Sequence, residues 1–229
     1  MKVMMLLYPG QTPQDTIGPL TAFGALPGFE AQFVWKQPGP VLSDAGISLL
    51  ATHSFQQAWK DPDILFVGGG AKPTIDLLDD EETLAFLADR GSRAQWITSV
   101  CTGSLLLGAA GLLRGYRSAC HWAVREMLSA FGAIPAPERV VFDRNRASGG
   151  GVTAGLDFGL ALVGRLQGES YGRMVELVME YAPAPPFGCG RPELADAATL
   201  EAAMGFFGEN VPVDAIARAA QRLNRGAIA

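Results

Sequence analysis

The 229-residue sequence contains no run of lysine or arginine and no long apolar stretch. Its 18 lysines and arginines are outnumbered by 23 aspartates and glutamates, which gives a formal net charge of −5. Nucleic-acid binding needs clustered cations to neutralise phosphates, so this balance argues against a nucleic-acid partner. No apolar run approaches the roughly 20 residues that a membrane span requires, so no membrane partner is expected either.

Cysteine and histidine are scarce as well. Three cysteines, an odd number, do not suggest a disulfide framework. The N-terminal apolar run over residues 3–8 is too short for a secretory signal and is ended by Pro9-Gly10. We therefore expect a protein of the reducing cytoplasm. The histidines, cysteines and carboxylates do not stand at ligand spacing, so no metal site is predicted.

The sequence has enough apolar material for a sizeable core, with 48% hydrophobic and 18% charged residues. Short β-type runs alternate with longer helical runs, which predicts a mostly parallel sheet covered by helices on both faces. In such sheets, ligands bind at the carboxyl ends of the strands. We expect strands at 3–8, 31–35, 64–67 and 96–100, and helices at 17–25, 81–89, 102–110, 122–131, 153–166 and 171–181.

Two hairpins and an arm complete the expected organisation. Residues 39–51 and 140–148 have the pattern of hairpins. The segment 183–187 contains three prolines, which remove backbone donors and exclude a helix. We predict a catalytic domain over residues 1–190, ending in this extended arm, and a helical tail over residues 191–229 that packs on the same domain.

Cys101 is the strongest chemical candidate. The strand 96–100 leads directly into it, and Gly103 follows two residues later. This pattern resembles a nucleophile elbow, a tight strand-to-helix turn that thrusts the reactive side chain above the sheet. The dipole of the following helix would favour the thiolate by about one pKa unit. The alternative is a small buried hydrophobic residue, as most free cysteines are; the elbow pattern favours the nucleophile.

Asp15 is the natural residue to handle protons, because it lies in an otherwise uncharged loop after the first strand. It could instead be the N-cap of the helix at 17–25, a role that aspartate prefers, and the residues do not separate the two interpretations. Gly69 and Gly70 follow the strand 64–67. Their N–H groups could face a developing negative charge, or they could simply form a turn.

His121 has two equally weighted interpretations. It could activate Cys101, since a Cys–His pair is the usual route to a thiolate, or it could only bond the backbone at a helix start. Cys120 and Cys189 are interpreted as structural residues.

Several segments together resemble the ThiJ/PfpI superfamily (class I glutamine amidotransferase-like fold). They are the elbow at 99–104, the leucine-rich helix that follows to residue 113, the Ala-Cys-His-Trp segment at 119–122, and the glycine-rich segment at 149–157. The loop with Asp15 and the segments 34–40, 132–135 and 180–187 are similar to the isocyanide hydratase group within it. The likeness covers most of the chain to about residue 190. It implies a flavodoxin-like three-layer α/β sandwich with a mostly parallel central sheet.

This resemblance also implies an activity: cofactor-free addition of water to an isocyanide, giving an N-substituted formamide. Cys101 would attack the isocyanide carbon to form a thioimidate, and Asp15 would protonate this intermediate and then help water to attack. A homodimer and a small-molecule substrate are implied as well. The remaining site residues implied are Thr102, Gly69 and Gly70, which would position charge, and Gly150 and Val152, which would line the pocket.

Two residues depart from the pattern of this group. Cys120 stands where threonine is expected before the His-Trp pair, which points toward redox chemistry. Lys72 stands where a small or neutral polar residue is commoner, which could change substrate preference. His121 is not expected to complete a catalytic triad in this group.

Three other functions stay open. A glyoxalase-like or deglycase-like enzyme acting on α-oxoaldehydes would also use Cys101 and a carboxylic acid. A ligand-binding module similar to the sensor domains of AraC-type regulators is disfavoured, since the roughly forty residues after Gly188 are too few for a helix-turn-helix domain and lack its basic patch. A sensor in which Cys101 is oxidised to sulfinate would turn over no substrate.

Overall fold

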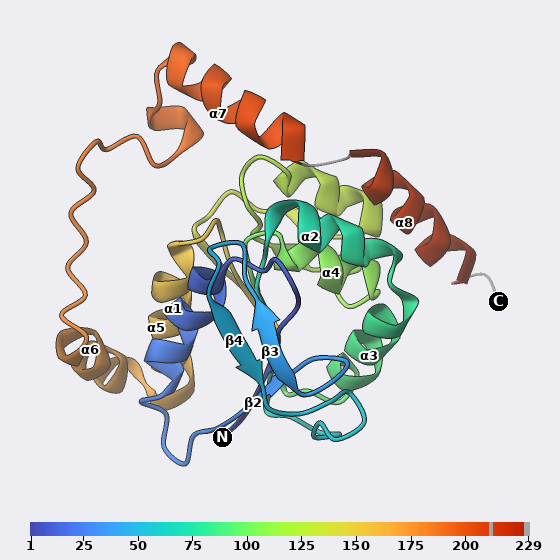
Figure 1. Ribbon diagram of the computed structural model, residues 1–229. Coiled ribbons are helices and arrows are strands. Elements are labelled where there is room, and N and C mark those ends of the chain that lie inside the picture. Colours follow the sequence, from blue (N-terminus) through green and yellow to red (C-terminus); the bar gives the residue numbers. More distant parts are fainter. Residues whose placement is uncertain (211–212, 227–229) are drawn as a thin grey trace.

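The computed structural model describes residues 1–210 and 213–226, and its centre is a six-stranded sheet (Figure 1). The strand order is β2-β1-β5-β6-β10-β9. Neighbouring strands are parallel except for β9, which runs antiparallel to β10 at one edge. The strands are β1 (Lys2–Leu6), β2 (Glu30–Val34), β5 (Ile64–Val67), β6 (Trp96–Val100), β9 (Val140–Asp143) and β10 (Arg146–Gly149).

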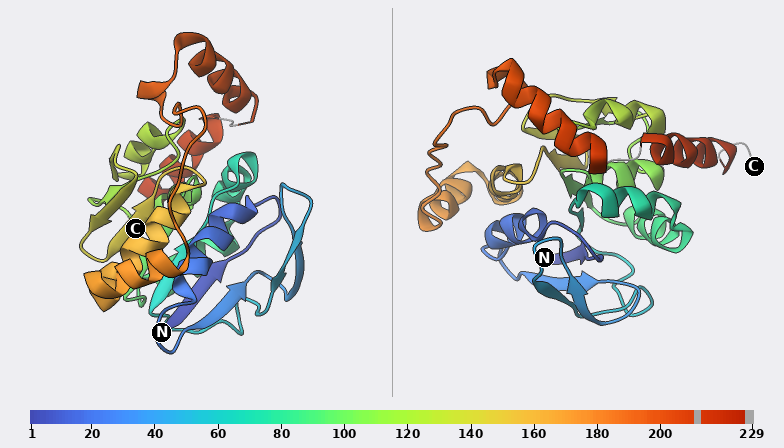
Figure 2. Two further views of the ribbon diagram at one scale, coloured as in Figure 1. Left: turned by 90° about the vertical axis from the view of Figure 1, so that its left-hand side faces the viewer. Right: turned by 45° about the horizontal axis from the view of Figure 1, so that its top comes forward.

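Side chains of β1 alternate between two hydrophobic cores, because successive residues of a strand point to opposite faces. Val3 and Met5 enter one core, while Met4 and Leu6 enter the other. Helices flank the sheet on both sides (Figures 1 and 2), which confirms the flavodoxin-like three-layer prediction. The first core is covered by α1 (Pro13–Phe23) and α5 (Ala154–Gln167), and the second by α2 (Ala71–Asp76), α3 (Glu81–Gly91) and α4 (Gly103–Ala109).

The predicted hairpins are both present. Strands β3 (Gly39–Leu42) and β4 (Ser48–Ala51) form a separate two-stranded sheet. The second hairpin is β9–β10, whose second strand joins the main sheet beside β6. Two short strands, β7 (Arg117–Ser118) and β8 (Ile134–Pro135), pair in parallel as a separate two-stranded sheet, with β7 in contact with β9 and β10.

The structure corrects two helix predictions and adds one helix. The helix expected at 17–25 begins earlier, at Pro13, because proline is well suited to the first helical position. The α-helix expected at 122–131 is instead a 3₁₀ helix, η2 (Arg125–Phe131), in which the three-residue period puts Leu128 and Phe131 together in the core. Helix α2 was not predicted; its Pro73 lies in the first turn, where a missing N–H costs nothing.

The C-terminal part leaves the body and returns to it. Helix α6 (Glu169–Val178) leads into an irregular, exposed arm, followed by η3 (Pro192–Leu194), α7 (Ala197–Asn210) and α8 (Val213–Gly226) (Figure 1). Apolar residues of α8, including Ile216 and Ala219, belong to the second core, and Arg222 donates to the Leu78 carbonyl at 2.7 Å. The tail assigned to residues 191–229 includes positions 211–212 and 227–229, which lie outside the described residues.

Over the described ranges, no helix is long and apolar enough to cross a membrane.

Candidate active site

The carboxyl ends of four parallel strands bring the candidate residues together. Cys101 directly follows β6, and Gly69 and Gly70 follow β5. Asp15 lies in the first turn of α1, which the loop after β1 leads into. Val152 follows β10. Convergence at this edge is the arrangement expected for parallel α/β sheets.

Cys101 has the geometry of a nucleophile elbow. Its φ is +61°, a left-handed conformation that non-glycine residues rarely adopt, and the side chain is 5% exposed. The Cys101 amide donates to the Gly150 carbonyl at 2.7 Å, which fixes the turn. A Cβ atom on Gly103 would lie 2.2 Å from the Val67 carbonyl oxygen. Only glycine therefore allows α4 to start this close to β5.

Asp15 is fully buried beside this elbow. Its Oδ2 accepts a hydrogen bond from the Gly69 amide at 2.7 Å. Its Oδ1 is buried with no hydrogen-bond partner of ordinary geometry in residues 1–210 and 213–226. The N-cap of α1 is Thr12, three residues earlier. The N-cap interpretation of Asp15 is therefore wrong, and its carboxyl group faces the site.

The two side chains shift each other's protonation. Burial raises the pKa of Asp15 to about 7, against the Gly69 hydrogen bond and the interaction with Cys101, which lower it. Burial also raises the pKa of the Cys101 thiol well above its usual value, and the negative charge of Asp15 adds to this rise. Hydrogen bonds from the Val152 and Thr102 backbone oppose the shift without cancelling it. The helix dipole was predicted to favour the thiolate by about one pKa unit; desolvation outweighs an effect of that size, so the thiol pKa is raised.

Gly69 and Gly70 differ from their predicted role. The Gly69 amide is bonded to Asp15, and the Gly70 amide donates to Thr102 Oγ1 at 3.1 Å. A Cβ atom on Gly69 would lie 2.5 Å from Thr102 Oγ1 and 2.9 Å from Asp15 Oδ2. These amides therefore hold the acid and Thr102 in place and are not open donors for a substrate oxyanion.

The hydroxyl proton of Thr102 is also used in a hydrogen bond within the protein. Tyr8 donates its one hydroxyl proton to the Gly68 carbonyl at 2.9 Å, so Thr74, 2.8 Å from the Tyr8 oxygen, must be the donor to Tyr8. Thr102, 2.8 Å from Thr74 Oγ1, must then donate to Thr74. The chain runs in one direction, from the Gly70 amide to the Gly68 carbonyl. Thr102 thus positions the loop and has no proton to give a substrate.

This chain predicts the behaviour of Thr102→Val. Valine keeps the shape of threonine but leaves the buried Gly70 N–H without an acceptor and Thr74 without a donor. We expect the free energy of unfolding to fall by about 1–3 kcal/mol, as for one unsatisfied buried group, measured by denaturant titration. Thr102→Ser keeps the hydroxyl and should stay close to wild type in stability and turnover. Equal losses of unfolding free energy in Thr102→Val and Thr102→Ser would contradict this one-way chain of hydrogen bonds.

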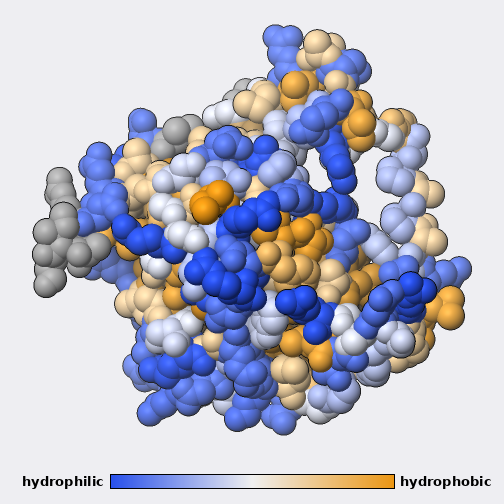
Figure 3. Space-filling view, turned by 180° about the vertical axis from the view of Figure 1, so that it is seen from behind, coloured by the Kyte–Doolittle hydropathy of each residue, from blue (hydrophilic) through white to orange (hydrophobic). Residues whose placement is uncertain are grey.

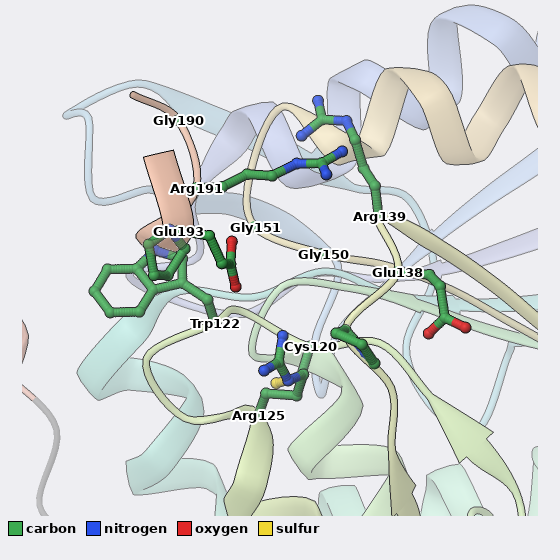
Figure 4. A pocket seen from close by; sticks show the side chains of 12 residues that line it. Cys120, Trp122, Arg125, Glu138, Arg139, Gly150, Gly151, Gly190, Arg191 and Glu193 are labelled. Atoms are coloured by element: carbon green, nitrogen blue, oxygen red, sulfur yellow. The ribbon is translucent and has the colours of Figure 1, made fainter. Parts of the chain in front are cut away.

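Cys101 opens into a cavity of about 350 Å³. Val152 lines it, as predicted, and so does His121; the aromatic residues Phe206 and Phe207 of α7, which the sequence did not indicate, also line it. Gly150 does not line it; with Cys120 it borders a neighbouring small pocket instead (Figure 4). The full lining is Thr12, Asp44, Gly70, Ala71, Lys72, Pro73, Cys101, Thr102, His121, Val152, Phe206 and Phe207.

His121 is a neutral wall of the cavity. Burial lowers its pKa to about 4. Its Nδ1 accepts from the Ala123 amide at 3.3 Å, so the neutral ring carries its proton on Nε2. A positively charged His⁺ partner for a Cys101 thiolate is therefore absent near pH 7. This agrees with leaving His121 out of the catalytic set.

Cys120 and Lys72 depart from the group's pattern, and their surroundings limit the reactivity of the first and the charge of the second. Burial raises the pKa of Cys120 to about 12, which disfavours the thiolate that redox chemistry uses. Lys72 Nζ pairs with Asp76 at 2.6 Å, so its charge is partly balanced at the cavity rim. Cys189 is exposed on the arm, which does not fit the structural role assigned to it.

In the part of the chain that the structure describes, no group of three or more histidine, cysteine or acidic side chains could hold a metal ion.

The chain resembles known proteins along nearly its whole length. It is 43% identical over 203 residues to an isonitrile hydratase of Pseudomonas putida, covering 89% of this chain and 88% of that protein. A ThiJ/PfpI family protein from Pseudomonas syringae superposes with a TM-score of 0.91 at 46% identity, covering 96% and 90% of the two chains. An AraC family transcriptional regulator from Pseudomonas putida superposes with a TM-score of 0.70 at 25% identity, covering 78% and 98%. Residues 1–165, which hold the elbow, the acid and the glycine loops, match the DJ-1/PfpI family, and the chain belongs to it.

Proposed function

We propose that this protein is an isocyanide hydratase, which converts an isocyanide and water to an N-substituted formamide. The observation that carries the proposal is the pairing of the buried Asp15 carboxyl group with the elbow residue Cys101, which lines a cavity of about 350 Å³. The 43% identity to an isonitrile hydratase over most of both chains supports the same reaction.

In the first half-reaction, Asp15 accepts the thiol proton while the Cys101 sulfur bonds to the isocyanide carbon. Asp15 then returns that proton to the same carbon, which gives a thioimidate with a C=N bond. A carboxyl group with a pKa of about 7 suits both transfers, since neither protonation state dominates near neutral pH. This also explains how a thiol with a raised pKa can act: it loses its proton as the S–C bond forms.

In the second half-reaction, water attacks the thioimidate carbon and Asp15 takes a proton from the water. Asp15 passes this proton to the nitrogen. The carbon–sulfur bond then breaks as the hydroxyl proton of the intermediate moves through Asp15 to the sulfur, and the formamide leaves with Cys101 again a thiol. The atoms of one water are thereby added to the isocyanide, and no electrons are exchanged with an external reagent. These residues need neither a metal nor an organic cofactor for the sequence.

The cavity suits a small, neutral, largely apolar substrate. Its volume of about 350 Å³ lies at the lower end of small-molecule sites. Two phenylalanines and Val152 supply apolar walls, and the Lys72 charge is paired with Asp76. An isocyanide has no net charge to be neutralised, unlike a phosphorylated or carboxylated ligand.

The homodimer implied by the family resemblance stays a prediction.

The oxidation-sensor alternative is less well supported. Oxidation of cysteine follows its thiolate character, and burial beside Asp15 raises the thiol pKa. An α-oxoaldehyde enzyme would use the same two side chains, so the substrate has to be tested directly.

The deciding experiment follows hydration of para-nitrophenyl isocyanide by absorbance, with the formamide product identified by NMR. Methylglyoxal is supplied to the same protein in a parallel reaction. We expect turnover of the isocyanide and none of methylglyoxal. Consumption of methylglyoxal without isocyanide turnover, by protein whose circular dichroism shows it folded, would replace the hydratase with the glyoxalase-like function.

A further inference from the structure

The C-terminal part reaches the active site by an unusual route. After α6, the arm over residues 182–190 runs along the outside of the molecule and is exposed throughout. The space-filling view shows an opening between this arm and the body (Figure 3). Residues 183–190 make no hydrogen bond to the other residues that the structure describes. The arm therefore acts as a tether, and α7 is placed by its own contacts.

Those contacts are aromatic and lie at the cavity. The Phe207 ring is 4.4 Å from the His121 ring and 5.7 Å from the Trp122 ring, measured between centroids. His121 is only 8% exposed, and Phe206 and Phe207 both line the cavity that holds Cys101. Figures 1 and 2 show α7 lying across the end of the molecule beside α2. A helix far along the sequence thus closes the space over the nucleophile.

We propose that Phe207 forms the wall that receives the substituent on the isocyanide nitrogen, so that α7 decides which isocyanides fit. This inference rests on the proposed hydratase function. With the isocyanide carbon at Cys101, the linear C–N–R unit points its substituent away from the elbow, into the part of the cavity that α7 covers. An aromatic substituent there can stack or meet Phe207 edge-on, which adds to simple burial of apolar area.

His121 is a positioning residue for this wall. Its ring lies at 44° to Phe207, and its orientation is fixed by the Ala123 amide at Nδ1. Because the ring is neutral near pH 7, it presents no charge to an apolar substituent. The wall is thus assembled from two distant parts of the chain, with His121 on the body and Phe207 on the tail.

The test compares two substrates in three variants. Phe207→Ala should lower kcat/KM for para-nitrophenyl isocyanide at least about tenfold relative to wild type, while kcat/KM for methyl isocyanide changes little. Phe207→Leu keeps apolar packing without the ring and should show a smaller loss for the aryl substrate. Met204→Ala is the matched control, because Met204 lies on the same helix, is 48% exposed and does not line the cavity. It should behave as wild type with both substrates.

A binding measurement separates this inference from the proposed reaction. N-Phenylformamide should protect Cys101 from alkylation by iodoacetamide, followed by mass spectrometry of the Cys101 peptide, and Phe207→Ala should weaken that protection about tenfold. N-Methylformamide should be affected little by the same change. Suppose that isocyanides are hydrated but the Phe207 variants lose kcat/KM equally for the aryl and methyl substrates, or for neither. The proposal that Phe207 receives the substituent is then wrong. If isocyanides are not hydrated while N-phenylformamide protection still depends on Phe207, the hydratase fails and the aryl-binding wall stands.

Discussion

Replacing Cys101 with alanine should abolish isocyanide hydration, with a loss of more than about 10³-fold in kcat, and leave the fold intact. The thiol is the only proposed group that bonds to the substrate carbon, so no other side chain can form the thioimidate. The change removes one buried atom and keeps the Cβ, so the left-handed backbone at this position is no more strained than before. Absorbance of para-nitrophenyl isocyanide measures the loss, and thermal unfolding by circular dichroism measures stability.

Cys101→Ser is the matched control for shape. Serine keeps the size and the backbone hydrogen bonds of the elbow, but its hydroxyl is a much weaker nucleophile, so it should be nearly as inactive as alanine. Residual activity above one tenth of wild type in Cys101→Ala would mean that the substrate is attacked by water directly. The covalent route would then be abandoned and Asp15 alone would be the catalytic residue.

Asp15→Asn should lower kcat by about 10²–10⁴-fold, because both proton transfers of the proposed reaction pass through this carboxyl group. Asparagine is nearly the same size, and its Oδ1 can accept the hydrogen bond from Gly69 that Asp15 accepts now. Stopped-flow or steady-state hydration kinetics with the aryl isocyanide would measure the effect. Unchanged kcat would contradict the role of Asp15 as the proton carrier.

The same variant should change how stability depends on pH. Burial raises the pKa of Asp15 from 3.8 to about 7, so between these values the folded protein binds a proton that the unfolded chain has lost. This group therefore stabilises the wild type at low pH, and its contribution disappears as pH rises through about 7. Asparagine does not titrate. From pH 5 to pH 7.5, the free energy of unfolding of the wild type should fall by on the order of 2 kcal/mol relative to that of Asp15→Asn.

Urea titrations of both proteins at pH 5 and pH 7.5 would measure this difference. Asp15 is the one titratable group that differs between the two proteins, so it dominates the comparison between them. If the difference in unfolding free energy between the two proteins is the same at both pH values, Asp15 has an ordinary pKa. Proton transfer by Asp15 in both directions near neutral pH would then be contradicted.

Local signals in the sequence were sufficient for most of the sheet and for the elbow at Cys101. Strands such as β5 and β6 are short apolar runs buried on both faces, and their bounds were predicted as observed. The elbow followed from a strand, a cysteine and Gly103, because the close approach of Val67 to that glycine permits no side chain. Family resemblance supplied Asp15 as the proposed acid. The local pattern alone left it open as an N-cap, since the Thr12-Pro13 start of α1 was missed.

Electrostatics and the far wall of the site were decided only by the tertiary structure. The sequence places a helix after Cys101 but cannot say how deeply the thiol is buried, and desolvation proved larger than the effect of the helix. The direction of the Gly70–Thr102–Thr74–Tyr8 chain depends on three segments meeting, so no local pattern contains it. Phe207 reaches His121 across 85 positions of sequence by way of an exposed arm. The sequence by itself therefore determined the fold and the elbow at Cys101, which arise from local periodicity and sterics, whereas protonation states and the cavity walls arise from long-range packing.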